Sequence, residues 1–235
     1  MKCIILAAGR NTRLDNGIPK SMLKVGDETL MERHIRLFRH IGVTQFCVIT
    51  GYRHQMLEAF FASRTEYISS AVQLIHNPEF DRANGVSLNC ASDWVGSSDE
   101  PFFFTMADHF FTEAFLKEVI KAVANVKTLT LVVDRPSEIN KHIDLEDVTK
   151  VKTSKGLIVE IGKQLKEYDC YDTGLFMARK VMFEHLRTSI ANGGDSISNM
   201  VQALAGKGLA DVYEVNGHFW NDVDTPSDLA TTRDS

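Results

Sequence analysis

The first residues of the chain constrain its fold more than any other stretch. An apolar run from Cys3 to Ala8 ends at Gly9, which predicts a buried strand opening into a loop whose backbone lies close to a ligand. Backbone N–H groups in such a loop, together with cations at Arg13 and Lys20, can surround a polyphosphate and stabilise charge that develops on it. A surface loop with two solvated cations explains the same residues, and the loop alone does not decide between them.

Two other phosphate-binding loops are excluded by the sequence. No Gly-x-x-x-x-Gly-Lys-Ser/Thr string occurs, and the first turn lacks the Gly-x-Gly-x-x-Gly of dinucleotide-binding proteins. A polyphosphate at this loop would therefore be bound in another way.

Composition narrows the class of protein. With 235 residues and no Pro/Gly/Ser-rich linker, the chain is expected to form one domain over residues 1–235. Its formal net charge of −5 argues against a sequence-independent nucleic-acid binder, and its apolar runs are too short for a membrane span. The N-terminus lacks the features of a signal peptide, and the cysteines are scattered without metal-type spacing. These features predict a cytoplasmic protein.

Strands and helices alternate after the first loop. Apolar residues recur at helical spacing at Met31, Ile35 and Phe38. A second helix is predicted over residues 54–62, and apolar runs at 46–49 and 72–75 predict strands. This order predicts an α/β fold with a doubly wound, mostly parallel (Rossmann-like) sheet, in which helices cover both faces and ligands bind at the carboxyl ends of the strands.

Three carboxylates follow extended segments. Asp108 ends the apolar strand that begins at Pro101, although a helix cap or a turn is the commoner role for a single aspartate there. Asp222 and Asp224 alternate on an extended segment, so they point the same way and can share a cation. His109 is expected in the pocket wall, because magnesium prefers oxygen ligands.

Local patterns predict two further features. A hairpin is expected over residues 144–163 with a glycine in its turn, and Lys150 and Lys152 are interpreted as solvated residues on its edge. A polar turn before residue 84 leads into an apolar helix whose N-cap is expected to be Asn84.

Several strings spread along the chain resemble those of a known family. They are Leu-Ala-Ala-Gly-x-x-x-Arg-Leu with Pro-Lys, Ala-Asp-His, Asp-x-Glu-Asp-x-Thr-Lys-Val, Ile-Gly-Lys-x-Leu-x-x-Tyr-Asp, Asp-Thr-Gly-x-Phe and Trp-x-Asp-x-Asp-Thr-Pro-x-Asp-Leu. Together they resemble the inositol-1-phosphate cytidylyltransferases, of the sugar-phosphate nucleotidyltransferase family, over essentially the whole chain. The resemblance implies a nucleotidyltransferase-type sheet with a small β-hairpin subregion that binds the acceptor.

The resemblance also implies roles for individual residues. The residues that match the family's nucleotide-binding motifs are Leu6, Ala7, Ala8, Gly9, Asn11, Thr12, Asn84, Gly85 and Ser87. Among these, Gly85 and Ser87 would read the edge of a pyrimidine. Arg13 and Lys20 would offset charge on the triphosphate. Magnesium would bind between Asp108 and Asp224, with Asp222 as a further candidate ligand.

The acceptor side is implied in the same way. Lys163 matches the lysine that binds the acceptor's phosphate, and the segment that lines the ring pocket matches Asp172, Thr173 and Gly174. One position departs from the family pattern, because Asn11 stands where the second glycine of Gly-x-Gly-x-Arg is expected. Asparagine tolerates the left-handed backbone region better than most residues, so the shape of the loop can survive.

The implied reaction is a magnesium-dependent transfer of the CMP moiety of CTP to inositol 1-phosphate, which gives CDP-inositol and pyrophosphate. Two alternatives stay open at this stage. One is the same chemistry with phosphocholine or a hexose 1-phosphate, and the other is a catalytically silent regulatory domain, to which Asn11 lends support. Similar enzymes can be fused to a membrane-embedded phosphatidyltransferase-like domain, so a partner of that kind is expected.

Overall fold

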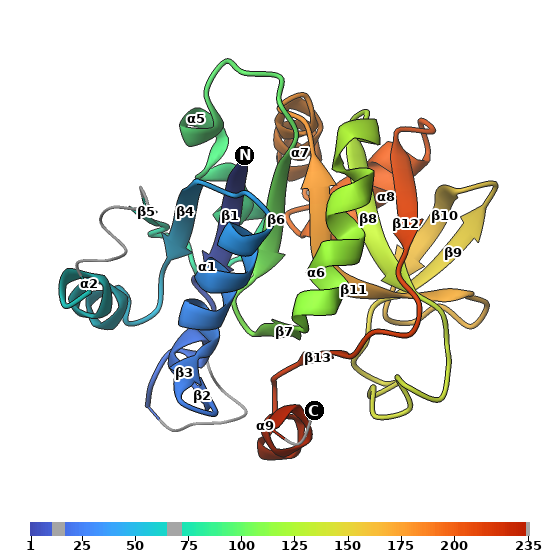
Figure 1. Cartoon of the computed structure of the whole chain (residues 1–235). Coiled ribbons are helices and arrows are strands. Elements are labelled where there is room, and N and C mark those ends of the chain that lie inside the picture. Colours follow the sequence, from blue (N-terminus) through green and yellow to red (C-terminus); the bar gives the residue numbers. More distant parts are fainter. Residues whose placement is uncertain (11–16, 65–71, 234–235) are drawn as a thin grey trace.

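The computed structural model describes residues 1–10, 17–64 and 72–233 (Figure 1). A nine-stranded sheet runs through the molecule in the order β5-β4-β1-β6-β11-β8-β12-β10-β9. Its strands are β1 (Lys2–Ala7), β4 (Gln45–Thr50), β5 (Val72–His76), β6 (Phe102–Met106), β8 (Leu129–Asp134), β9 (Lys150–Ser154), β10 (Leu157–Gly162), β11 (Cys170–Ala178) and β12 (Ala210–Glu214). Two small sheets pair β2 (Lys24–Val25) with β3 (Glu28–Thr29) and β7 (His109–Phe111) with β13 (Trp220–Asp222).

Helices cover both faces of the large sheet. One face carries α1 (Leu30–His40), α2 (His54–Ala62) and α6 (Glu113–Val119), and the other carries α4 (Asn84–Asn89), α5 (Ser92–Val95), α7 (Met182–Ala191) and α8 (Ile197–Ala205). The helix α9 (Pro226–Arg233) and the 3-10 turns η1 (Lys20–Met22) and η2 (Ile120–Asn125) complete the fold. No helix of the described residues is long and apolar enough to cross a membrane.

The prediction of a mostly parallel sheet is correct for one half of the sheet and wrong for the other. Strands β5, β4, β1 and β6 are all parallel to their neighbours, as the alternation of strands and helices predicts. In the second half, β11 is antiparallel to β6, β8 and β9, and β10 is antiparallel to β9 and β12. Here β9, β10 and β11 follow one another without a helix, and a parallel pair needs a long crossover. The sheet is therefore mixed.

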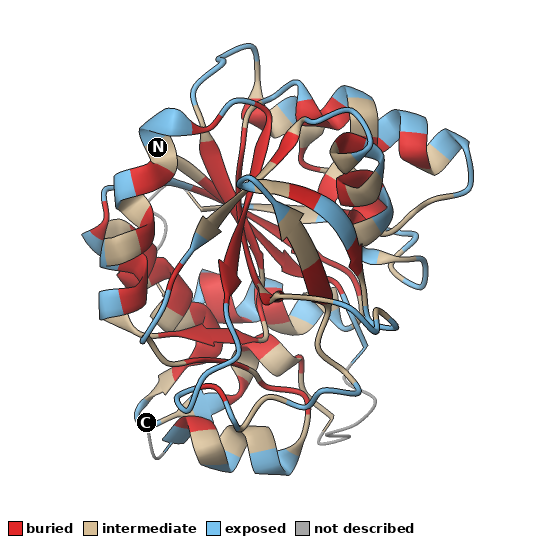
Figure 2. Ribbon diagram, turned by 90° about the vertical axis from the view of Figure 1, so that its right-hand side faces the viewer, coloured by how far each residue is buried: buried red, intermediate tan, exposed pale blue. Residues whose placement is uncertain are grey.

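The core has two layers because the strands alternate their side chains. In β1, Cys3 and Ile5 join the cluster beneath α1, α2 and α6, whereas Ile4 and Leu6 join the cluster beneath α7 and α8. Figure 2 shows the buried strands at the centre and the exposed residues on the outer surfaces of the helices. Both faces of β1 are thus packed, which explains why its sequence is continuously apolar.

Most local predictions are confirmed. The second helix covers His54–Ala62, and β9 and β10 form the expected hairpin. Its turn residues Lys155 and Gly156 have φ angles of 52° and 78°, the left-handed pair of a type I′ turn.

Two local predictions are wrong. Asn84 is the first residue of α4 and not its N-cap, and its Oδ1 accepts a hydrogen bond of 2.9 Å from the backbone N–H of Ile197 in α8. Asn84 therefore satisfies the start of another helix, a contact that local sequence cannot reveal. Lys150 is buried, with 9% of its surface exposed, whereas it was expected to be solvated.

A buried histidine makes the fold sensitive to acid. His34 of α1 donates from Nδ1 to the carbonyl oxygen of Leu30 at 2.8 Å and meets the ring of Phe111 edge-on at 5.9 Å. Burial lowers the pKa of His34 from 6.5 to about 4, because the charged imidazolium would lose its hydration.

We predict that His34 contributes to the pH dependence of stability. Its pKa is lower in the folded than in the unfolded chain, so its contribution is present above pH 6.5 and is lost as the pH falls toward about 4. His34→Gln should remove about 3 kcal/mol of pH dependence from the free energy of unfolding over this range. Urea unfolding measured across the range tests this. His40→Gln, at an exposed site on the same helix, is the control, and an unchanged slope in His34→Gln would contradict the prediction.

Candidate active site

A cavity of about 470 Å³ lies at the ends of the central strands, next to β7 and β13. Residues from distant parts of the sequence line it. Those used below are Asn84, Asp108, His109, Asp144, Asp147, Lys163, Asp172, Gly174, Trp220, Asp222, Asp224 and Asp228. The cavity therefore contains most of the carboxylates that the sequence singled out.

The pairing of β7 with β13 assembles the first part of this site. The register places Asp222 opposite His109, and the backbone N–H of Val223 donates to the carbonyl of Asp108 at 3.0 Å. Phe110, the residue after His109 on β7, turns to the other side and packs with Leu23 and Val223. The alternation of one short strand thus sends His109 toward the cavity and Phe110 into a small core.

The side chains of Asp108, His109 and Asp222 form a compact cluster whose possible ligand atoms lie within 4.8 Å of one another. Nδ1 of His109 is 3.1 Å from Oδ1 of Asp108 and 4.0 Å from Oδ1 of Asp222. Oδ1 of Asp222 is buried and has no hydrogen-bond partner among the described residues. Carboxylate oxygens are the ligands that Mg²⁺ prefers, so Asp108 and Asp222 fit that ion.

The charges in this cluster depend on one another. Burial by itself would lower the pKa of His109, but the charge of Asp222 and the hydrogen bond to Asp108 outweigh it and raise the pKa to about 9. Burial would likewise raise the pKa of Asp108, but Lys20 and His109 hold it well below its usual range. Burial raises the pKa of Asp222 to about 6. The raised pKa of His109 favours its charged form, and the two oxygens of Asp108 face His109 and Lys20 in this arrangement.

Lys20 connects the two carboxylates that were expected to hold magnesium. Its Nζ lies 3.1 Å from Oδ2 of Asp108 and also forms an ion pair with Oδ1 of Asp224. Asp224 is held by the start of α9, where Oδ2 of Asp228 accepts the backbone N–H groups of Asp224 and Thr225. The structure thus brings Lys20, Asp108 and Asp224 together, and it brings Asp222 to Asp108 from the other side.

The side of the cavity that is expected to bind the acceptor is built by β10, β11 and the loop of residues 135–149, which we call the acceptor loop after that expectation. Nζ of Lys163 pairs with Oδ1 of Asp147 at 2.5 Å. Asp172 accepts the backbone N–H of Gly174 at 2.8 Å, and burial raises the pKa of Asp172 to about 6. Thr173 is fully buried and donates to the carbonyl of Val132, so its side chain faces the core and not the cavity.

The residues that are expected to bind the nucleotide lie in different environments. Gly85 is buried, and a Cβ there would lie 2.5 Å from the carbonyl oxygen of Asp195, so the close approach of two chains requires glycine. Ser87 is buried and accepts from the side chain of Asn77 at 2.9 Å, while Asn84 alone of the three lines the cavity.

The first loop is described only at its beginning. Leu6, Ala7 and Ala8 are buried at the end of β1, and Gly9 is exposed just beyond it. Asn11, Thr12 and Arg13 lie outside the described residues.

Sequence reasoning missed two groups of residues near these sites. Arg10 follows β1, lies over the rings of Tyr52 and Phe80, and pairs with Asp81 at 2.7 Å. Its partners come from separate parts of the chain, so no local signal marks them. The acids of the acceptor loop, Asp144 and Asp147, stood in a string that was used only for the family resemblance.

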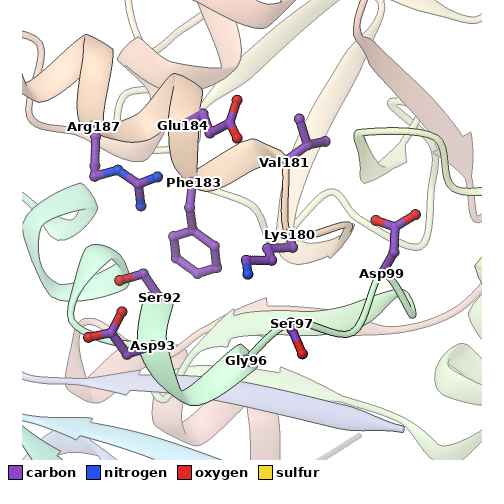
Figure 3. Close-up of a pocket in the computed structure, with 10 residues that line it drawn as sticks. All are labelled: Ser92, Asp93, Gly96, Ser97, Asp99, Lys180, Val181, Phe183, Glu184 and Arg187. Carbon is purple, nitrogen blue, oxygen red and sulfur yellow. The ribbon is translucent and has the colours of Figure 1, made fainter.

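A larger cavity, of about 710 Å³, lies at the other end of the central strands, between α5 and α7 (Figure 3). Its cations are Lys180, which precedes α7, and Arg187 of α7, and its lining also includes Glu184 of the same helix (Figure 3). Asp93 of α5 and Asp99 of the loop that follows it add further negative charge. The smaller cavity, in which the pKa values of Asp108, Asp172 and Asp222 are perturbed, is the better candidate for chemistry.

Solved structures identify the class of fold. The inositol-1-phosphate CTP transferase from T. maritima superposes with a TM-score of 0.83 at 22% identity, covering 100% of this chain and 96% of that one. A UDP-glucose pyrophosphorylase in complex with UDP-glucose gives a TM-score of 0.79 at 15% identity, covering 99% and 97%. The fold is therefore that of the nucleotidyltransferases that act on phosphorylated sugars and related compounds. The expected fold type is confirmed at this level.

Sequence comparison then gives the family. Residues 3–206 match the MobA-like NTP transferase domain, and the chain belongs to that family. It is 31% identical to the bifunctional IPC transferase and DIPP synthase of Thermococcus kodakarensis, over 99% of this chain and 50% of that protein. The CTP:phosphoglutamine cytidylyltransferase of Campylobacter jejuni is 27% identical, over 97% of this chain and 98% of that protein. The chain thus spans about half the length of its bifunctional relative.

We predict that Gly174 is required because it leaves room for His109. A Cβ at Gly174, which has a φ of +75°, would lie 2.1 Å from Nε2 of His109. Gly156 has a similar φ of +78° but has nothing within 4 Å, so it isolates the cost of the backbone conformation. Gly156→Ala should lose about 1 kcal/mol of stability and keep its activity. Gly174→Ala should lose more and slow the reaction at least about tenfold, because His109 must move.

Urea unfolding and initial rates on the two variants measure these effects. The prediction is wrong if the two alanine variants have the same stability and the same rate.

Proposed function

We propose that this chain transfers the CMP moiety of CTP to inositol 1-phosphate and releases pyrophosphate, with Mg²⁺ as cofactor. The observation that carries the proposal is the presence in one cavity of a carboxylate cluster at Asp108 and Asp222 and a lysine, Lys163, on the acceptor side. The names of the full-length relatives, IPC transferase, and of the T. maritima structure support the choice of inositol 1-phosphate and CTP.

The chemistry needs no nucleophile from the protein. A phosphate monoester dianion is already nucleophilic, so its oxygen can attack the α-phosphorus of CTP in line with the departing pyrophosphate. The work left for the protein is to align two polyanions and to offset their repulsion. A bound magnesium ion would supply most of that charge neutralisation.

The charge of the cavity supports a cation requirement. Its lining includes seven aspartates, at 108, 144, 147, 172, 222, 224 and 228. Two polyanions would not enter such a site without added positive charge. Lys20, whose ammonium lies between Asp108 and Asp224, and the imidazolium of His109 provide part of it. In our proposal Asp108 and Asp222 hold the magnesium ion, and Asp224 becomes available to it when Lys20 turns to the triphosphate.

The acceptor side suits a neutral polyol that carries a phosphate. Lys163 would exchange Asp147 for the acceptor's phosphate, and Asp144 and Asp172 would accept hydrogen bonds from ring hydroxyls. A quaternary ammonium is normally held by an aromatic cage. Of the described residues that line the cavity, Trp220 is the one Phe, Tyr or Trp, and only 2% of its surface is exposed. This favours inositol 1-phosphate over phosphocholine.

The bifunctional relatives also indicate a partner. Since the chain spans about half of such a protein, we propose that its product is passed to a DIPP synthase-like membrane phosphatidyltransferase. The catalytically silent alternative is less favoured, because a silent domain has no need of the paired carboxylates at 108 and 222.

We predict efficient formation of CDP-inositol from CTP and inositol 1-phosphate, and little product from phosphocholine. A site built to pair hydroxyl groups should turn over phosphocholine with a kcat/KM about 10⁴-fold lower, because the buried polar groups of the site would be left without partners. Chromatography of the nucleotide products with each acceptor tests this. Comparable turnover of phosphocholine would overturn the acceptor, and the absence of pyrophosphate release with every acceptor would favour the silent domain.

A further inference from the structure

Lys150 is a buried lysine that the reaction as proposed does not use. It begins β9, and 9% of its surface is exposed. Its Nζ donates to the carbonyl oxygen of Leu145 at 2.6 Å and to that of Lys163 at 2.7 Å, and it lies 5.7 Å from the centre of the Tyr168 ring. Among the described residues no carboxylate forms an ion pair with it. We propose that Lys150 is a positioning residue for the acceptor, an inference that rests on the proposed function.

The two carbonyl groups belong to the segments that face the acceptor. One is the backbone of Lys163, whose side chain is proposed to bind the acceptor's phosphate. The other belongs to Leu145 in the acceptor loop, between Asp144 and Asp147, which both line the cavity. A single ammonium group therefore joins the two segments that carry the lysine and the carboxylates of the acceptor site.

Neighbouring backbone bonds support the same geometry. The N–H of Asp172 donates to the carbonyl of Thr149 at 2.9 Å, and Tyr171 of β11 pairs with Lys150 in the sheet. Thr149, the last residue of the acceptor loop, is thus hydrogen-bonded to β11 at the position directly before Lys150. A shift of the Lys150 side chain would therefore move the backbone of Lys163 and the part of the acceptor loop that contains Asp144 and Asp147.

The buried charge of Lys150 indicates a role beyond the stability of the hairpin. Burying an ammonium is costly unless its protons are hydrogen-bonded, and bonds from a charged donor are short and strong. A hairpin edge that needed only stability could carry an apolar residue here. Lys152, on the same strand, shows the ordinary arrangement, because it is exposed to water and pairs with the exposed Glu167 at 2.7 Å. The donors of Lys150 are turned to the backbone, so it acts through Lys163 and the loop.

The test compares Lys150→Met with Lys152→Met. If Lys150 positions the acceptor site, Lys150→Met raises KM for inositol 1-phosphate at least about tenfold and leaves KM for CTP within about twofold, since a misplacement of about 1 Å can cost up to a hundredfold. Lys152→Met leaves both constants unchanged. A role in stability alone would lower the melting temperature of Lys150→Met without changing either KM, and that result would overturn the proposal.

A double-mutant cycle shows whether Lys150 acts through Lys163. In the Lys163→Ala background, Lys150→Met should raise the acceptor KM by a smaller factor than it does alone, because the side chain being positioned is gone. Fully additive effects would contradict this route.

Hydrogen exchange tests the proposal without any acceptor. Lys150→Met should speed amide exchange in residues 144–149 and 162–165, and Lys152→Met should not. Unchanged exchange would overturn the positioning role even if the enzyme makes CDP-inositol. Faster exchange in a protein that makes no CDP-inositol would instead leave Lys150 as a positioning residue and overturn only the proposed function.

Discussion

The antiparallel pairing of β7 with β13 is the contact on which the candidate site depends. It joins residues more than a hundred positions apart in the sequence and sets Asp222 beside Asp108 and His109. The ribbon is held by backbone hydrogen bonds and by Trp220, whose indole N–H donates to Asp134 at the end of β8 at 2.9 Å. Asp134 also accepts from Asn140 of the acceptor loop at 2.9 Å. One buried carboxylate thus joins β13, which carries Asp222, to the acceptor loop.

Charge balance is the second constraint. The cavity gathers aspartates that would repel one another and any phosphorylated substrate. Lys20 offsets Asp108 and Asp224, His109 offsets Asp108 and Asp222, and Lys163 offsets Asp147. Each of these cations lies where a substrate or a metal ion would also compete for the carboxylate. These cations offset only part of the charge of the aspartates, and the entry of a metal ion and a triphosphate would redistribute these pairs.

Local sequence was sufficient to predict most of the strands and helices, but not the contacts between them. Continuous apolar runs predicted β1, β4 and β6, and the Lys-Gly turn predicted the β9–β10 hairpin, since these features depend on neighbouring residues. The antiparallel insertion of β11 was missed because strand direction depends on tertiary connections. The burial of Lys150 and the contact of Asn84 with α8 were missed for the same reason. Asp108, Asp222 and Lys163 were identified through motifs, and only the folded chain shows that they share a cavity.

The central claim is that Asp108 and Asp222, joined by the β7–β13 pair, hold the divalent cation. The most direct measurement is a titration with Mn²⁺ followed by electron paramagnetic resonance, which reports bound metal without requiring catalysis. Asp222→Asn should weaken binding at least about tenfold, since it removes a charged ligand while keeping the size of the side chain. Asp93→Asn, in the other cavity, should bind Mn²⁺ as the wild type does. Equal affinities for wild type and Asp222→Asn would contradict the account.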